Sequence, residues 1–219
     1  MLRMILVAFC LLAAACVAPN DTVSDDLDTQ KDLSPADVED DVFLNTLEGI
    51  HDTDPTDLLP PSPITWGSCS GVEGDHPCNL MGPDQRGDTF GLYAHYGRPI
   101  VLDFSAGWCG PCRSAAVHAE EVQNLYQDDG LLYVTVLIET ANGSVPTQQD
   151  VAAWADEYGN VDSLVVGGSR AMLQSGGGTW PLSGWPTFYY IDDEMVLRDI
   201  DRGYNAQEVL YSIDWLLSL

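Results

Sequence analysis

The sequence predicts an α/β domain in which strands and helices are layered, and three observations support this fold class. Two apolar runs, Pro99–Ser105 and Leu131–Glu139, are rich in β-branched residues and are typical of buried strands. A stretch with apolar residues at helical spacing, Pro111–Gln127, separates them. Two later strand patterns precede a final capped helix. Without the short strand candidate Leu164–Val166, the resulting order is β-α-β-α-β-β-α, that of an α/β layered domain.

The remaining elements follow in chain order. Gly91–Tyr96, ahead of the first strand, predicts a short helix or turn. After the second strand, Thr147 caps a helix that runs to Tyr158, and Leu164–Val166 is a short strand candidate.

The C-terminal part predicts a hairpin and a helix. The hairpin strands are Thr187–Asp192 and Glu194–Ile200, with Asp192 and Asp193 near the turn. Asn205 caps the closing helix, which runs to the C-terminus.

The 219-residue chain is strongly acidic, with 34 Asp and Glu against 8 Lys and Arg and a formal net charge of −26. Such a surface cannot neutralise phosphates, which argues against a nucleic-acid partner. It is not attracted to an anionic membrane either, so any membrane attachment must come from another feature.

Residues 1–16 predict an export signal. Arg3 precedes an apolar run of 12 residues, Met4–Ala15. That run is shorter than the ~20 residues that span a bilayer, but it has the length of the apolar region of a signal peptide. The segment that ends at Cys16 resembles a bacterial lipobox, whose cysteine is lipidated and becomes the new N-terminus.

This resemblance implies a lipid anchor at Cys16, and Val17 after it implies attachment to the outer membrane, facing the periplasm. The lipobox pattern prefers Leu at the position of Ala13. An ordinary secretory signal, cut near Ala15 or Ala18, is therefore the alternative. Both interpretations place the mature protein outside the cytoplasm.

Residues 17–60 predict an acidic, disordered tether between the anchor and the domain. The segment has 13 acidic residues and one lysine, and it cannot bury enough apolar area to offset its ordering entropy. A spacer is the simplest role, and an arm that docks a partner is the alternative. The domain itself is predicted to cover residues 61–219.

The cysteines predict two disulfides. Cys10 leaves with the signal, and four cysteines then remain in the exported domain. Proximity in sequence favours pairing Cys109 with Cys112 and Cys69 with Cys78. The latter pair is interpreted as a structural staple, with a second redox pair as the alternative. A zinc ion on all four cysteines and a purely structural Cys109–Cys112 bond also remain open.

Ile100–Arg113 (IVLDFSAGWCGPCR) carries the predicted chemistry. A buried strand ends, a short loop turns, and CGPC opens a helix. Only a thiolate attacks a disulfide, and a helix N-terminus favours a thiolate at Cys109. The two-residue spacing lets Cys112 reach back to resolve a mixed disulfide. Pro111 suits the first helical turn.

Two motifs resemble a known family. DFSAGWCGPCR is similar to the active-site segment of thioredoxins, and Gly184–Phe188 looks like their cis-proline loop. The added strand and helix before that loop, with the exported lipoprotein context, resemble membrane-anchored oxidoreductases of the TlpA/ResA type. The resemblance covers residues 78–219. It implies a thioredoxin-like fold, with a central mixed sheet flanked by helices and an N-terminal extension.

The resemblance also implies residue roles. Cys109 would attack, Cys112 would resolve, and Asp103 would be the buried carboxylate that helps proton transfer. Residues that would contact the substrate are Trp108, Gly110, Pro111, Trp185, Pro186 and Thr187. Alternatively, the two tryptophans are packing residues of the core and Asp103 is an ordinary residue at the end of a strand.

Four departures from the family pattern stand out. Ala115 stands where the TlpA/ResA pattern often has Glu, and Ser105 where thioredoxins often have Trp. No lysine in Leu131–Glu139 can pair with Asp103. The bulky Trp185 before the cis-proline would narrow the substrates accepted.

The predicted function is thiol–disulfide oxidoreduction on proteins, in the reducing direction because Gly-Pro separates the cysteines. It implies protein thiols and disulfides as partners and a membrane electron donor, but no metal or cofactor beyond the redox-active disulfide. A non-catalytic binding or assembly module and a peroxide reductase on the same fold are the alternatives. The client, donor and oligomeric state stay open.

Overall fold

The computed structural model describes residue 64 and residues 66–219. The predicted export signal, lipid anchor and tether lie outside the described residues. Within the described part of the chain, no helix is long and apolar enough to cross a membrane.

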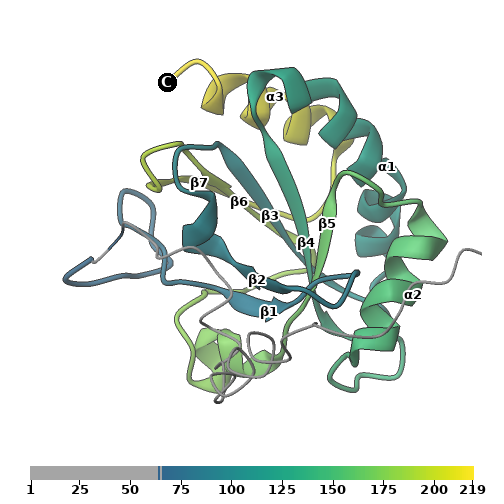
Figure 1. The fold of residues 1–219 in the computed structure, drawn as a ribbon. Coiled ribbons are helices and arrows are strands. Elements are labelled where there is room, and N and C mark those ends of the chain that lie inside the picture. The colour runs from purple at the N-terminus through teal and green to yellow at the C-terminus, as the bar shows by residue number, and fades with distance from the viewer. Residues whose placement is uncertain (1–63, 65) are drawn as a thin grey trace, which may run out of the picture. The chain divides into compact units, whose positions relative to one another are not determined.

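A five-stranded mixed sheet forms the centre of the domain, in the order β5-β4-β3-β6-β7 (Figure 1). The first three strands of this sheet in sequence are parallel to one another, β6 pairs antiparallel with β3, and β7 pairs antiparallel with β6. This confirms the predicted α/β architecture with a mixed sheet. The strands are β3 Ile100–Ala106, β4 Leu132–Glu139, β5 Leu164–Gly167, β6 Thr187–Ile191 and β7 Leu197–Arg202.

Three α-helices cover one face of the sheet (Figure 1): α1 Gly110–Tyr126, α2 Gln148–Tyr158 and α3 Ala206–Leu216. The predicted caps are present. The Thr147 side chain accepts from the Asp150 N–H in a capping box, and the Asn205 side chain accepts from the Gln207 N–H. Parallel strands require such crossover helices, so β3, α1 and β4 form one continuous unit.

Each face of the sheet has its own apolar core. Alternate residues of β3 and β4 point to opposite faces, so Leu102 and Val134 join one core while Val101 and Tyr133 join the other. The second core packs against α1 and α3, and α2 packs on Leu137 and Val165 beside it. Asp103 lies two residues after Val101 in the same strand, so its side chain points to the same face, the one under α1.

A small hairpin, β1 Met81–Pro83 with β2 Thr89–Gly91, was not predicted. Its strands are three residues long and contain Gly and Pro, so no period-two pattern marks them. The Asp84 carboxylate closes the turn by accepting from the N–H groups of Arg86 and Asp88. The predicted 91–96 turn appears as the 3₁₀ helix η2, Leu92–His95.

The second strand of the C-terminal hairpin begins later than predicted. Strand β7 starts at Leu197, not at Glu194. Met195 has a positive φ of 59°, which no strand residue adopts. The Asp192 carboxylate accepts from the Val196 N–H at 2.7 Å, so the turn extends to that residue.

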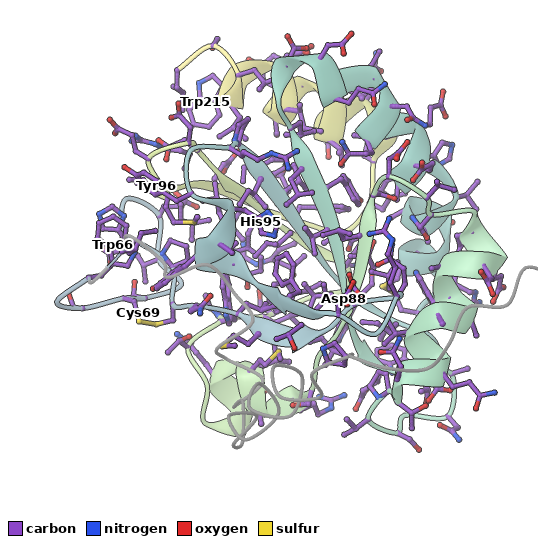
Figure 2. The ribbon with its side chains drawn as sticks, viewed as in Figure 1. Trp66, Cys69, Asp88, His95, Tyr96 and Trp215 are labelled. Atoms are coloured by element: carbon purple, nitrogen blue, oxygen red, sulfur yellow. A yellow bond between two sulfur atoms is a disulfide. The ribbon has the colours of Figure 1, made fainter. Side chains whose placement is uncertain are left out.

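The Cys69–Cys78 disulfide closes a loop that covers the edge of the sheet. The Gly74 N–H donates to the Leu197 carbonyl at 2.8 Å, and the Leu197 N–H donates to the Asp75 carbonyl at 3.0 Å. Trp66 and Cys69 lie on the same side of the molecule (Figure 2). Strand β7 is an edge strand, and covering such an edge blocks pairing with other chains.

Glu120 on α1 ties this helix to the loop between α2 and β5. Its carboxylate accepts from the N–H groups of Val161, Asp162 and Ser163 at 2.9, 2.9 and 3.0 Å, and from the Ser163 hydroxyl at 2.7 Å. Burial acts to raise the pKa of Glu120, but these hydrogen bonds outweigh it and lower the pKa. The contribution to stability is therefore present above the ordinary pKa and lost as the pH falls through the lowered one.

We expect Glu120→Gln to destabilise the domain at pH 7 by about 1–3 kcal/mol, because an amide leaves part of this donor set unsatisfied. The difference from wild type shrinks as the pH falls below 4.5, where the wild-type carboxylate also becomes protonated. Urea denaturation at pH 7 and pH 3 measures it. Glu121→Gln, an exposed neighbour on the same helix, is the control. Equal losses in both variants would contradict the assignment.

Candidate active site

The two cysteines of the CGPC motif lie where β3 passes into α1. Cys109 is the N-cap of α1 and forms a disulfide with Cys112 in the first turn. The Cys112 N–H donates to the Cys109 sulfur at 3.2 Å. This N–H group is in the first helical turn and has no partner within the helix, so the sulfur satisfies it. Pro111 stands in the first turn, as predicted.

Very little of the disulfide is exposed to solvent. Cys112 is fully buried and only 4% of Cys109 is exposed, while Gly110, Pro111 and Trp108 are exposed around them. A partner can therefore reach the Cys109 sulfur at this rim, and Cys112 only through Cys109.

Gly107 shapes the loop before the motif. A Cβ on this residue would lie 2.6 Å from the Ala141 nitrogen, which leaves no room for a side chain. The Gly107 N–H donates to the Glu139 carbonyl at 2.7 Å, and its own carbonyl accepts from Arg113 at 2.8 Å. These bonds hold the loop against β4 and the start of α1.

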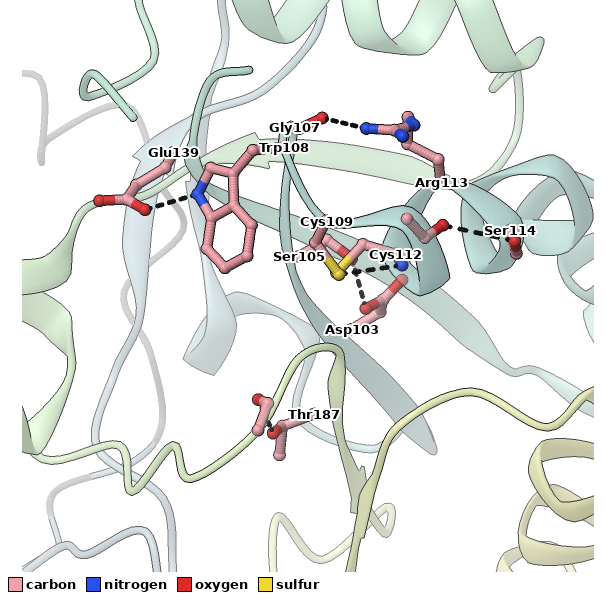
Figure 3. Close-up of a disulfide and its surroundings, with 12 residues drawn as sticks. Asp103, Ser105, Gly107, Trp108, Cys109, Cys112, Arg113, Ser114, Glu139 and Thr187 are labelled. Atoms are coloured by element: carbon pink, nitrogen blue, oxygen red, sulfur yellow. Dashed lines mark hydrogen bonds between the residues drawn. A yellow bond between two sulfur atoms is a disulfide. The ribbon is translucent and has the colours of Figure 1, made fainter. Parts of the chain in front are cut away.

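Asp103 lies in the middle of β3 and is completely buried. Its carboxylate points toward the helix start that carries the cysteines (Figure 3). The Ser105 hydroxyl donates to one oxygen at 2.7 Å and the Tyr133 hydroxyl to the other at 3.3 Å. Burial raises the pKa of Asp103 to about 7, and the two hydrogen bonds oppose this rise. The group can therefore exchange a proton near neutral pH.

Tyr133 occupies a role that sequence reasoning missed. Residues 64 and 66–219, which the structure describes, contain no lysine that could face Asp103. Thr135 stands opposite Asp103 in the strand register, and the hydroxyl of Tyr133 supplies the polar contact instead. The available signal was a tyrosine inside an all-buried strand, since a buried phenol needs a hydrogen-bond partner. Ser105, noted only as a departure from the thioredoxin pattern, is the second donor.

A second network holds Trp108. The indole N–H donates to the Glu139 carboxylate at 2.8 Å (Figure 3). Arg170, from the segment after β5, forms a two-pronged contact with the same carboxylate. The Arg170 hydrogen bond lowers the pKa of Glu139, burial opposes it, and the Trp108 hydrogen bond lowers it further. Sequence reasoning singled out neither Glu139 nor Arg170, because the contact joins positions 31 residues apart.

The predicted cis-proline loop lies against the disulfide. The Trp185–Pro186 peptide bond is cis. Trp185 packs on the cluster formed by Ala106 and the two cysteines, and its ring meets the Trp108 ring edge-on at 5.6 Å. Trp185 therefore covers one side of the disulfide. The sequence predicted that this bulky side chain before the proline would narrow the range of substrates.

Two of the predicted substrate-contacting residues are buried. Pro186 is buried, and its carbonyl accepts from the Gly203 N–H at 2.8 Å. Thr187 is fully buried, with its hydroxyl donating to the Gly184 carbonyl at 2.9 Å. Ala115 packs in the core under α1, next to Val101, where the family pattern often has a glutamate.

The four cysteines of the described residues lie in two bonded pairs and not in one cluster. Within residues 64 and 66–219, no group of three or more histidine, cysteine or acidic side chains could hold a metal ion. The site described above contains a disulfide, a buried carboxyl group and two tryptophan side chains.

Comparisons with known proteins identify the family. The Redoxin family model matches residues 73–213. Thioredoxin-like protein YneN of Bacillus subtilis (strain 168) is 28% identical over 117 residues, which are 53% of this chain and 64% of that protein. The chain thus spans less than two thirds of this relative's length.

Solved structures show the same fold. A thiol:disulfide interchange protein of the thioredoxin family from Chlorobium tepidum TLS aligns with a TM-score of 0.54 at 19% identity, over 67% of this chain and 98% of that one. The pneumococcal exposed lipoprotein thioredoxin Etrx1 of Streptococcus pneumoniae strain TIGR4 aligns with a TM-score of 0.52 at 21% identity, over 64% and 100%. The chain belongs to the Redoxin family and has a thioredoxin-like fold.

Proposed function

We propose that this protein is an extracytoplasmic thiol–disulfide oxidoreductase that reduces protein disulfides through Cys109 and Cys112. The observation that carries the proposal is a disulfide at the first turn of α1, reachable at one sulfur and lying over a buried carboxyl group. A purely structural disulfide needs neither an accessible sulfur nor a buried carboxyl group beneath it. Both are needed for repeated opening and closing of the bond.

The reaction begins with the reduced protein. The Cys109 thiolate attacks one sulfur of a client disulfide, forms a mixed disulfide and releases the other client sulfur as a thiolate, which takes a proton from solvent. Helix α1 favours the charged sulfur, because the Cys112 N–H of its first turn points at it and the helix N-terminus carries a partial positive charge. Client access is limited to the rim formed by Trp108, Gly110 and Pro111.

The second step releases the client. Asp103 accepts the proton of the Cys112 thiol, and the Cys112 thiolate attacks the Cys109 sulfur. The mixed disulfide breaks, the Cys109–Cys112 bond forms, and the second client sulfur leaves as a thiolate. Two electrons have passed from the protein to the client, so a thiol donor must reduce the protein before the next turnover.

The proposed location and partners rest on the sequence. The export signal and Cys16 support a lipid anchor on the periplasmic side of an outer membrane, and the tether supports a spacer role. Etrx1, a structural neighbour, is described as an exposed lipoprotein. An exported reductase needs a membrane electron donor, and it needs no cofactor beyond its own disulfide.

We expect Cys109→Ser to abolish insulin reduction driven by a dithiol, and Cys112→Ser to accumulate a mixed disulfide that mass spectrometry detects. The matched control is the Cys69→Ser/Cys78→Ser double variant, which keeps the activity if that bond only staples the loop over β7. Undiminished insulin reduction by Cys109→Ser would overturn the proposed enzyme. A Cys109–Cys112 potential well above that of glutathione would overturn only the reducing direction.

Asp103→Asn is expected to slow the resolving step by roughly 10- to 100-fold at pH 8, because the base for Cys112 is lost. In the wild type this step slows as the pH falls through about 7, the pKa of Asp103, and the variant lacks that transition. Single-turnover kinetics between pH 5.5 and 9 measure both. Identical pH profiles in the two proteins would contradict the role of Asp103.

Stability provides the control for folding in the same variant. The folded pKa of Asp103 is raised from 3.8 to about 7, so its cost to the wild type is absent below 3.8 and grows as the pH rises to about 7. Urea denaturation should therefore find Asp103→Asn more stable than wild type at pH 8, with the difference shrinking toward pH 4. A slow but more stable variant separates loss of chemistry from loss of fold.

A further inference from the structure

A cavity of about 300 Å³ opens between α1 and α3, behind the active-site surface. Neither cysteine of the motif lines it, and neither do Trp108 and Trp185. It therefore lies apart from the rim where a client binds. Its polar lining residues are His118, Glu121, Tyr133 and Tyr204, and Ala206 of α3 also lines it.

Tyr133 connects this cavity to the buried carboxyl group. It is one of the cavity walls, and its hydroxyl donates to Asp103 at 3.3 Å. The other oxygen of Asp103 is taken by Ser105, which is itself fully buried. Of these two partners of Asp103, Tyr133 is the one that lines this cavity.

The opposite wall carries a second polar pair. The Tyr204 hydroxyl lies 2.9 Å from Nδ1 of His118, and the same nitrogen lies 3.0 Å from the Ser114 carbonyl. This nitrogen accepts from the Tyr204 hydroxyl in one tautomer of the ring and donates to the Ser114 carbonyl in the other. Burial raises the pKa of Tyr204, and the charges of Asp103 and Glu121 raise it further. The pair thus lies within the electrostatic field of the buried carboxyl group.

We propose that the proton taken up by Asp103 in each turnover leaves through the α1–α3 cavity by way of the Tyr133 hydroxyl, and not through the client-binding rim. This inference rests on the proposed function. At the moment of proton release the client still covers Cys109, so an exit at the rear lets the proton leave before the client does.

The transfer is balanced at every step. Protonated Asp103 gives its proton to the Tyr133 oxygen, while the Tyr133 hydroxyl releases its own proton to water in the cavity. Tyr133 is a neutral phenol before and after, in keeping with its raised pKa, which burial and then the Asp103 charge produce. The cavity is large enough for several water molecules, and Tyr204, His118 and Glu121 supply polar partners for them.

The first test uses Tyr133→Phe in the full-length protein. The resolving step is followed by release of the second thiol from a fluorescent peptide disulfide, in H₂O and in D₂O, between pH 5.5 and 9. The variant should resolve at least 5-fold more slowly at pH 7 with a larger solvent isotope effect, while the first attack by Cys109 keeps its rate. Tyr211→Phe, which removes an exposed hydroxyl from α3 outside the cavity, is the control.

The second test blocks the cavity without touching Asp103. Ala206→Phe places a large side chain at a lining position on α3, and Gln207→Phe places the same side chain at the next exposed position, which is not part of this cavity. Only Ala206→Phe should slow the resolving step and raise its isotope effect. The Cys109–Cys112 potential should stay unchanged, because a blocked path alters a rate and not an equilibrium.

The outcomes decide between explanations. Tyr204→Phe, which removes a hydroxyl that would partner the cavity water, should also slow the resolving step. If Tyr133→Phe is slow but Ala206→Phe and Tyr204→Phe behave as wild type, Tyr133 acts only through its hydrogen bond and the exit route is wrong. Wild-type rates and isotope effects in all three variants also overturn the route. If Tyr133→Phe does not fold, Ala206→Phe and Tyr204→Phe carry the decision. A wild-type protein that fails to reduce insulin refutes the proposed function itself, which is a separate result.

Discussion

The active site depends on a carboxyl group buried in β3 beneath the first turn of α1. Asp103 loses all contact with solvent and keeps two hydroxyl donors, so burial brings its pKa to about 7. The free energy of unfolding is lowered when Asp103 is ionised, because a buried carboxylate is unfavourable. In the proposed mechanism, the gain is a group that accepts the proton of the buried Cys112 thiol. The sheet and helices position this group against the helix start.

Two separate networks support the two sides of the disulfide. On the client side, Glu139 joins Trp108 to Arg170 and so ties the active-site loop to the segment after β5. On the other side, Asp103 is hydrogen-bonded to Tyr133, which lines the cavity between α1 and α3. In the proposed mechanism, client binding at the rim and proton movement through the cavity therefore involve different residues and can be altered independently.

Local patterns predicted the sheet and the redox motif well. Strands β3 and β4 are long apolar runs, and the caps Thr147 and Asn205 mark helix starts by their own side chains. CGPC after a buried strand places a cysteine pair at a helix N-terminus by sequence adjacency alone. The β1–β2 hairpin and the late start of β7 escaped prediction, because short strands and a positive φ at Met195 leave no periodic signal.

The sequence by itself determined the α/β layering, the cysteine motif and the proline before Thr187, since each is written in neighbouring residues. The tertiary structure alone decided which groups complete the site. Tyr133 meets Asp103 across a strand pair, Arg170 meets Glu139 from a distant loop, and Trp185 meets the disulfide. The physical reason is that hydrogen bonds and ring contacts act over a few ångströms in space. Sequence separation carries no record of which side chains the packed core brings together.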